Sequence, residues 1–111
     1  MKKSIDIQVS PFRIAVNVNP SKIKEILKGY SEYEAVTNSN YIEIFGNENY
    51  DENLSASDED AFLYYESNID IYPKDDALTL EKQIQWAKGM VKIFAGEGIL
   101  AEIIAEFEHL L

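Results

Sequence analysis

The chain has 111 residues, of which 46% are hydrophobic and 12% aromatic, which is enough apolar material for one core and too little length for two. Its formal charge of −10 at pH 7 repels a phosphate backbone and argues against nucleic acid as a partner. The absence of cysteine excludes disulfides, thiolate nucleophiles and sulfur-ligated metal sites. We therefore expect one domain covering residues 1–111.

The start of the chain is basic, but Asp6, Gln8 and Ser10 interrupt the apolar run that a signal peptide needs. The most apolar segment, residues 98–107, contains two glutamates and is far shorter than the roughly 20 residues that span a bilayer. We therefore expect a cytoplasmic protein that does not enter the membrane.

The first elements are extended. Apolar and polar residues alternate over residues 5–9 and again over residues 12–18, with a change of parity at Pro11. This pattern predicts an extended segment bent near the proline, with a tight hairpin as the alternative. The pair Asn19–Pro20 then predicts the start of a short helix that ends near Gly29.

The centre of the chain predicts a β-hairpin with a long loop. A weak strand over residues 33–37 and a turn over residues 38–40 precede a second strand over residues 41–45. Residues 46–60 are mostly Asn, Asp, Glu and Ser, which predicts a loop. The next strand, over residues 62–72, is expected to have one apolar face. That face consists of Leu63, Tyr65, Ile69 and Ile71.

The last third predicts a helix and a closing strand. Apolar residues recur at intervals of four and three from Leu80 to Phe94, and Gly96 and Gly98 end this helix. Residues 99–107 fit a strand or a helix, and we favour the strand. The predicted fold is α+β, an antiparallel sheet with two helices on one face in the ferredoxin-like βαββαβ order.

Charge is unevenly distributed along the chain. No lysine or arginine occurs between Lys28 and Lys74, whereas 11 acidic residues do. They are Glu32, Glu34, Glu43, Glu48, Asp51, Glu52, Asp58, Glu59, Asp60, Glu66 and Asp70. A negative surface of this kind speeds the encounter with a basic partner and weakens with salt. The alternative is a solvated face that only keeps the protein soluble.

Several of the seven tyrosines accompany these carboxylates. Tyrosine provides much contact area at little cost in rotamer entropy, which favours recognition, although aromatic residues also suit pleated strands. We predict a partner-binding surface on the acidic hairpin. It consists of Glu48, Tyr50, Asp51, Glu52, Asp58, Glu59, Asp60, Tyr64, Glu66 and Tyr72.

The sequence gives little support for a metal site or for catalysis. Asn47, Asn49, Asp51 and Asn53 occupy alternate positions, with Asp58 eleven positions after Asn47, as in a calcium loop. Glu52 stands where the sharp turn of such a loop needs glycine, so we predict no metal site. His109, the only histidine, has no serine or cysteine motif to serve. We predict no catalytic residue, no cofactor and no enzymatic activity. A calcium- or small-molecule-responsive sensor, with a loop at residues 47–60 that orders on binding, is the alternative function.

Two further features carry predictions about packing. Arg13, the only arginine, lies in a predicted strand and is expected to form an outward cross-strand ion pair. Trp86, Met90 and Ile93 form a stripe beside the apolar face of the second helix. The stripe is expected to pack on the first helix, with a homodimer through this stripe as the alternative.

Short motifs in the last two-thirds of the chain resemble a known group of proteins. They are Tyr41–Ile44, Asn47–Asp51, Asp60–Tyr65, Ile69–Ile71 and Ala105–Glu108. They resemble small bacterial immunity proteins encoded beside toxins in polymorphic toxin systems. The resemblance implies an inhibitor of the immunity type and assigns no individual residue a role. The acidic hairpin of such an inhibitor would cover a basic site on its partner, and a nuclease toxin fits because its substrate-binding cleft is basic.

Overall fold

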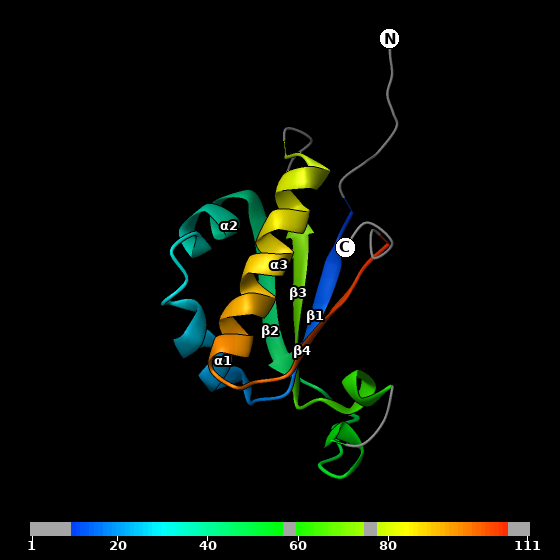
Figure 1. The fold of residues 1–111 in the computed structure, drawn as a ribbon. Helices are drawn as coiled ribbons and strands as arrows, with labels where there is room; N and C mark the ends of the chain where they lie inside the picture. Colours follow the sequence, from blue (N-terminus) through cyan, green and yellow to red (C-terminus); the bar gives the residue numbers. More distant parts are fainter. Residues whose placement is uncertain (1–9, 57–59, 75–77, 107–111) are drawn as a thin grey trace.

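The computed structural model describes residues 10–56, 60–74 and 78–106. These residues form a four-stranded sheet, three α-helices and two short 3-10 helices (Figure 1). In chain order they are β1 (Phe12–Val16), α1 (Pro20–Leu27), α2 (Tyr33–Ser39), β2 (Asn40–Gly46), η1 (Leu54–Ala56), η2 (Ala61–Tyr64), β3 (Ser67–Pro73), α3 (Leu80–Gly96) and β4 (Ala101–Ile104).

The strands lie in the order β2-β3-β1-β4, and each neighbouring pair is antiparallel. The expected α+β class with an antiparallel sheet is therefore confirmed. The finer expectation of a ferredoxin-like order with two helices is not confirmed, because α2 is a third helix inserted between α1 and β2.

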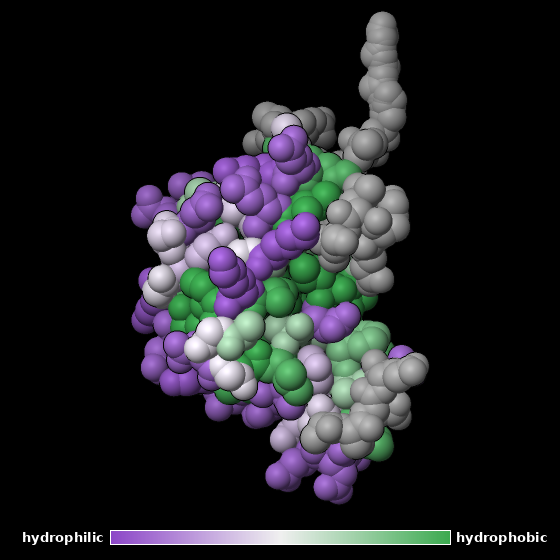
Figure 2. All heavy atoms as spheres, in the orientation of Figure 1, coloured by the Kyte–Doolittle hydropathy of each residue, from purple (hydrophilic) through white to green (hydrophobic). Residues whose placement is uncertain are grey.

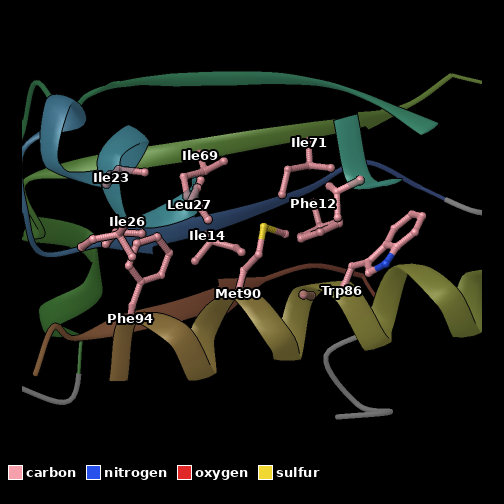
Figure 3. Close-up of a cluster of buried hydrophobic side chains, with 13 residues drawn as sticks. Phe12, Ile14, Ile23, Ile26, Leu27, Ile69, Ile71, Trp86, Met90 and Phe94 are labelled. Carbon is pink, nitrogen blue, oxygen red and sulfur yellow. The ribbon is translucent and has the colours of Figure 1, made fainter. Parts of the chain in front are cut away.

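One face of the sheet packs against all three helices and forms the main core (Figure 3). The side chains of Ile14, Ile69 and Ile71 from the two central strands are fully buried there. From the helices come Ile23, Ile26, Leu27, Val36, Trp86, Ala87, Met90 and Phe94. Because side chains alternate along β1 and β3, the residues between the inward-facing ones point to the opposite face of the sheet, where Ala15, Ala61 and Tyr65 form a smaller buried cluster.

Side-chain caps begin both α1, as the sequence predicted, and α3. The Asn19 side chain accepts a hydrogen bond from the backbone N–H of Lys22 at 2.8 Å. At the start of α3, the Thr79 hydroxyl oxygen accepts one from the N–H of Lys82 at 3.1 Å. Each cap satisfies a backbone donor that the helix leaves unpaired. The helix over residues 80–96 ends before Gly98, which has a φ of 73°.

The segment before β2 was expected to be a strand over residues 33–37 and a turn over residues 38–40, and this expectation is wrong. It is the helix α2, whose Val36 side chain is fully buried in the core. The Asn40 side chain donates a hydrogen bond to the backbone oxygen of Val36 at 3.0 Å and satisfies a carbonyl at the helix end. Burial and this cap outweigh the modest strand propensity of the segment.

The strand expected over residues 62–72 is shorter than predicted. β3 begins only at Ser67, and residues 61–64 form the 3-10 helix η2. Consequently Leu63 is half exposed, and Tyr65 packs against Ala15 on the face of the sheet away from the helices. The Asn47 side chain donates hydrogen bonds to the carbonyl oxygens of Leu63 and Tyr65, so these groups are not available to a strand ladder.

The chain after α3 forms the expected strand, which pairs with β1 over residues 101–104. The homodimer through the stripe of Trp86, Met90 and Ile93 is not supported. Trp86 is 3% exposed and Met90 is fully buried, because both belong to the core beneath α3. The alternation predicted over residues 5–9 lies outside the described residues.

Candidate protein-binding surfaces

The acidic lobe is the segment that joins β2 to β3 at one end of the sheet, described over residues 47–56 and 60–66 (Figure 1). Asn47 fastens it at the base. Its backbone N–H donates to the carbonyl oxygen of Glu66 at 2.9 Å. Its side-chain amide donates to the carbonyl oxygens of Leu63 at 3.0 Å and Tyr65 at 2.8 Å. The two arms of the lobe are therefore held side by side.

Asp51 organises the outer turn of the acidic lobe. One of its carboxylate oxygens accepts hydrogen bonds from the N–H groups of Asn53 at 2.9 Å and Leu54 at 3.1 Å. Its own N–H donates to the carbonyl oxygen of Tyr64 at 3.1 Å. Asp51 thus starts η1 as an Asx turn does. This predicted partner-binding residue has a structural role in the lobe.

An open groove of about 460 Å³ lies between the two arms of the acidic lobe. It is lined by Glu48, Asn49, Tyr50, Asp51, Leu63 and Tyr64. Its walls are partly accessible, since Tyr50 is 44% and Leu63 50% exposed and Glu48 is also exposed. Figure 2 shows that hydrophilic atoms gather at the outer end of the lobe.

The phenol of Tyr50 reports the electrostatics of this groove. Its pKa lies above the ordinary value, first because of partial desolvation and then because of the negative charges of Glu66, Glu52 and Asp51. All three carboxylates therefore act on one ring, although Glu66 and Asp51 come from opposite arms of the lobe. The negative potential that disfavours ionisation of the Tyr50 phenol would stabilise a positively charged group placed in this groove.

The predicted partner-binding residues are divided between two places. The acidic lobe contains Glu48, Tyr50, Asp51, Glu52, Asp60, Tyr64 and Glu66. Tyr72 lies apart from them, on β3. Asp58 and Glu59 lie outside the described residues.

Tyr72 belongs to a second surface, the open sheet face, which is the side of the sheet turned away from the helices. Cross-strand register places Tyr41 opposite Tyr72 and Glu43 opposite Asp70. Arg13 on β1 lies on the other side of Asp70. At the lobe end this face is covered by η2, whose Ala61 packs with Ala15. The open sheet face is thus aromatic and charged over β2 and β3.

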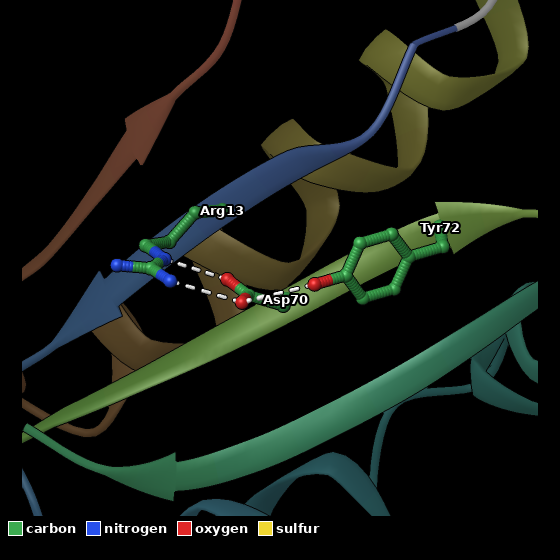
Figure 4. Close-up of polar contacts among 3 residues, drawn as sticks. All are labelled: Arg13, Asp70 and Tyr72. Atoms are coloured by element: carbon green, nitrogen blue, oxygen red, sulfur yellow. Dashed lines mark hydrogen bonds and ion pairs between the residues drawn. The ribbon is translucent and has the colours of Figure 1, made fainter.

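The expected ion pair of Arg13 is confirmed on this face (Figure 4). Its guanidinium donates two hydrogen bonds to Asp70, from Nε to Oδ1 at 2.6 Å and from Nη2 to Oδ2 at 2.9 Å. The Tyr72 hydroxyl also donates to Asp70 Oδ2, at 3.3 Å. The hydrogen bonds and charge of Asp70 raise the pKa of Arg13, so the guanidinium stays charged.

Sequence reasoning did not assign Tyr41 or Glu43 to a binding site. Both are exposed and point to the same side of β2, whose opposite side carries the apolar Ile42 and Ile44. The alternation of residues 41–45 contained this signal, since the residues between the isoleucines must face the other way.

The acidic run between Lys28 and Lys74 does not form one patch. Glu32 lies beside α3, where it accepts a hydrogen bond from the Trp86 indole at 3.2 Å and pairs with Lys82 at 3.6 Å. Glu34 is exposed on α2. The carboxylates that remain for a partner are therefore those of the acidic lobe and of the open sheet face.

Over the described ranges 10–56, 60–74 and 78–106, no group of three or more His, Asp or Glu side chains is arranged to hold a metal ion. His109 lies outside these ranges. In the same part of the chain, no helix has the length and apolar character needed to cross a membrane. The sensor alternative stays an untested prediction.

Comparison with known proteins yields no relative. No family model matches the sequence, and neither a curated protein nor a solved structure matches the chain. The resemblance to immunity proteins therefore stays a prediction, and functional proposals rest on the surfaces described above.

Proposed function

We propose that this protein is a non-enzymatic binding domain that uses the acidic lobe to cover a basic site on a partner protein. The observation that carries the proposal is the accessible groove in which Glu48, Tyr50 and Tyr64 lie together. Residues 47–66 contain no lysine or arginine that would neutralise it. A surface of one sign attracts a partner of the other sign and guides its orientation.

The internal bonding of the acidic lobe favours this role. The side chains of Asn47 and Asp51 form hydrogen bonds with backbone groups of the lobe itself. The groove therefore has its shape before a partner binds. Pre-organisation of this kind lowers the entropy lost on binding. The carboxylates of Glu48 and Glu52, on exposed residues, are then left for contacts with the partner.

The finer part of the proposal concerns the partner. An inhibitor of the immunity type is favoured by the resemblance of the sequence motifs and by the charge of the lobe. Nuclease toxins suit the proposal because the clefts that hold their nucleic acid substrates are basic, and an acidic protein surface competes for them. A gene for a secreted toxin beside the gene for this protein is the cheapest observation that bears on this assignment.

The test compares two triple variants in binding to the purified toxin encoded next door, at low and at high salt. The lobe variant carries Glu48→Gln, Glu52→Gln and Asp60→Asn. The control variant carries Glu34→Gln, Glu81→Gln and Glu97→Gln, which remove the same charge from exposed positions elsewhere. We expect the lobe variant to bind at least about tenfold more weakly and to lose most of the salt dependence.

The control variant has the same net charge as the lobe variant, so it separates a local effect from the total charge of the protein. Equal affinities of the two variants, or binding that does not change with salt, would remove the acidic lobe from the proposed function.

A further inference from the structure

We propose that the open sheet face is a second binding site, which takes an arginine or lysine side chain of a partner protein between Tyr41, Tyr72 and Glu43. This inference goes beyond the proposed function, because it concerns a different surface and does not depend on the acidic lobe. It rests on the register of the sheet, on the exposure of the two rings, on ring contacts already present and on the negative field at the Tyr72 ring.

The register brings the three groups together. Tyr41 and Tyr72 are directly opposite each other on β2 and β3, and the next outward pair on the same strands is Glu43 and Asp70. Directly opposed side chains in an antiparallel pair have Cβ atoms about 5 Å apart. The two phenol rings and the two carboxylates therefore form adjacent rows on one rigid surface.

The two rings are accessible to a partner. Tyr41 is 65% and Tyr72 41% exposed, although both belong to regular strands of seven residues. Aromatic side chains at the surface are enriched where proteins bind one another, since they combine large contact area with few rotatable bonds. Tyr41 and Tyr72 lie outside the main core, which is on the opposite side of the sheet.

Two aromatic rings of this face already lie close to a positively charged side chain of the same protein. The Lys74 ammonium lies 5.1 Å from the centroid of the Tyr41 ring. The Arg13 guanidinium lies 5.4 Å from the centroid of the Phe45 ring. Both distances fall within the range of cation–π attraction. An incoming basic side chain would use the same attraction at the Tyr72 ring.

The local field at the Tyr72 ring favours a cation, whereas over the whole face the carboxylates of Glu43 and Asp70 are matched in number by Arg13 and Lys74. Arg13 is neutralised by its two hydrogen bonds to Asp70. The exposed carboxylate of Glu43 has no ion pair within the described part of the chain. The negative field is felt at the neighbouring ring, where Asp70 first and Glu43 last raise the pKa of Tyr72 against the opposing effect of Arg13. Lys74, over Tyr41, is the other cation near the site.

The test is a titration of the full-length, ¹⁵N-labelled protein with the capped peptide acetyl-Gly-Arg-Gly-amide, followed by two-dimensional NMR. The matched peptide contains citrulline, which keeps the shape of arginine and lacks its charge, and a third contains lysine. We expect saturable shifts centred on Tyr41, Glu43 and Tyr72 with the two basic peptides and several-fold smaller shifts with the citrulline peptide.

Variants of the full chain locate the site. We expect Tyr41→Leu to weaken binding of the arginine peptide about two- to fivefold through the loss of one exposed ring contact. Glu43→Gln is expected to weaken it by a similar factor. Tyr72→Phe keeps the ring and is expected to change affinity less than twofold. All three positions are at the surface of the sheet or its edge, and circular dichroism verifies that each variant is folded.

The acidic lobe provides the internal control. Glu48→Gln with Glu52→Gln is expected to leave the shifts at Tyr41, Glu43 and Tyr72 in place. The inference is overturned if the shifts appear only in the lobe, if the citrulline peptide binds as well as the arginine peptide, or if no shift saturates. None of these outcomes depends on the toxin-binding experiment, so failure of one surface is distinguishable from failure of the other.

Discussion

The side-chain amides of Asn40 and Gln83 exchange two hydrogen bonds inside the core. Gln83 Nε2 donates to Asn40 Oδ1 at 2.9 Å, and Asn40 Nδ2 donates to Gln83 Oε1 at 3.2 Å. Asn40 is 2% exposed and Gln83 is fully buried. Because Asn40 begins the edge strand β2 and Gln83 lies in α3, the pair ties the edge of the sheet to the helix layer. A satisfied buried polar pair of this kind specifies one arrangement of the elements.

The first prediction removes one half of this pair. In Gln83→Leu the Asn40 side-chain oxygen is left buried without a donor, and we expect the free energy of unfolding to fall by about 1–3 kcal/mol. Urea denaturation measures the change. The control is Gln85→Leu, an exposed position on the same helix, where a change within about 0.5 kcal/mol is expected. Equal losses in the two variants would show that the amide pair does not stabilise the fold.

The periodic spacing of apolar residues and the presence of a helix-capping residue predicted much of this fold. Asn19 before Pro20 marked the start of α1, and the spacing of apolar residues marked α3, because these signals are local and the structure uses them without change. The alternation of residues 101–104 likewise predicted β4, which completes the sheet beside β1. Local chemistry and tertiary packing agree in these segments.

Errors arose where distant residues decide the structure. α2 forms because Val36 reaches the core and because Asn40, held by Gln83 on α3, caps its end. Tyr65 packs on the open sheet face, where its carbonyl oxygen accepts a hydrogen bond from the side chain of Asn47, 18 positions away.

Tyr41 and Glu43 of the open sheet face were not assigned to a binding site for a similar reason. Tyr41 and Tyr72 become neighbours only through strand pairing, and sequence spacing does not give the register.

The second prediction concerns Gly89, in the middle of α3. A Cβ at this position would lie 2.2 Å from the Tyr30 hydroxyl oxygen and 2.9 Å from the ring carbon that bears it. Tyr30 therefore lies close against the helix backbone, within an open groove between α1 and α3 of about 890 Å³. Apolar atoms are visible at the surface there (Figure 2). The glycine is explained by this contact, since glycine in a helix costs about 1 kcal/mol relative to alanine.

We expect Gly89→Ala to lower the free energy of unfolding by about 1 kcal/mol, because displacement of the Tyr30 ring outweighs the gain in helix propensity. The control is Gly96→Ala at the end of the same helix, where a Cβ would meet no atom within 4 Å. That variant is expected to be neutral or slightly stabilising. In a Tyr30→Leu background Gly89→Ala should no longer destabilise; a persistent loss would assign the effect to the helix and not to the tyrosine.

The third prediction concerns the base of the acidic lobe. Asn47→Ala removes two hydrogen bonds to the carbonyl oxygens of Leu63 and Tyr65, and we expect faster amide exchange and faster proteolysis within residues 48–56. Asn49→Ala is the matched control, because the Asn49 side chain is exposed and makes no hydrogen bond within the described residues. If both variants exchange at the same rate, the lobe is held by something other than Asn47.

The fourth prediction is a loss of stability in alkali. Burial raises the pKa of the Tyr33 phenol, and burial together with the charge of Glu102 raises that of Tyr65. Above pH ~10 the tyrosines of the unfolded chain ionise before these two do. The unfolded state then binds fewer protons than the folded state, so stability is full below this pH and falls as pH rises toward the raised values.

Urea denaturation at a series of pH values between ~8 and ~11 measures this fall. Replacing Tyr33 and Tyr65 with phenylalanine is expected to make the decline with pH shallower, because two of the phenols that release protons on unfolding are removed. An unchanged slope in the double variant would mean that other groups cause the loss.

The last prediction compares the effects of Asp70 and Glu43 on the pKa of Tyr72. The pKa of Tyr72 lies above its ordinary value chiefly because of the charge of Asp70, with which its hydroxyl also forms a hydrogen bond. In Asp70→Asn that charge is gone and Arg13, which opposes the shift, is no longer neutralised. Both changes act in the same direction, so the pKa of Tyr72 is expected to fall toward or below its ordinary value. NMR titration of the labelled Tyr72 ring measures this pKa.

Glu43→Gln is expected to lower the same pKa by a smaller amount, since Glu43 is the weakest of the groups that raise it. A larger effect from Glu43→Gln than from Asp70→Asn would mean that Glu43, and not the Asp70 carboxylate beside Arg13, sets the potential of this face.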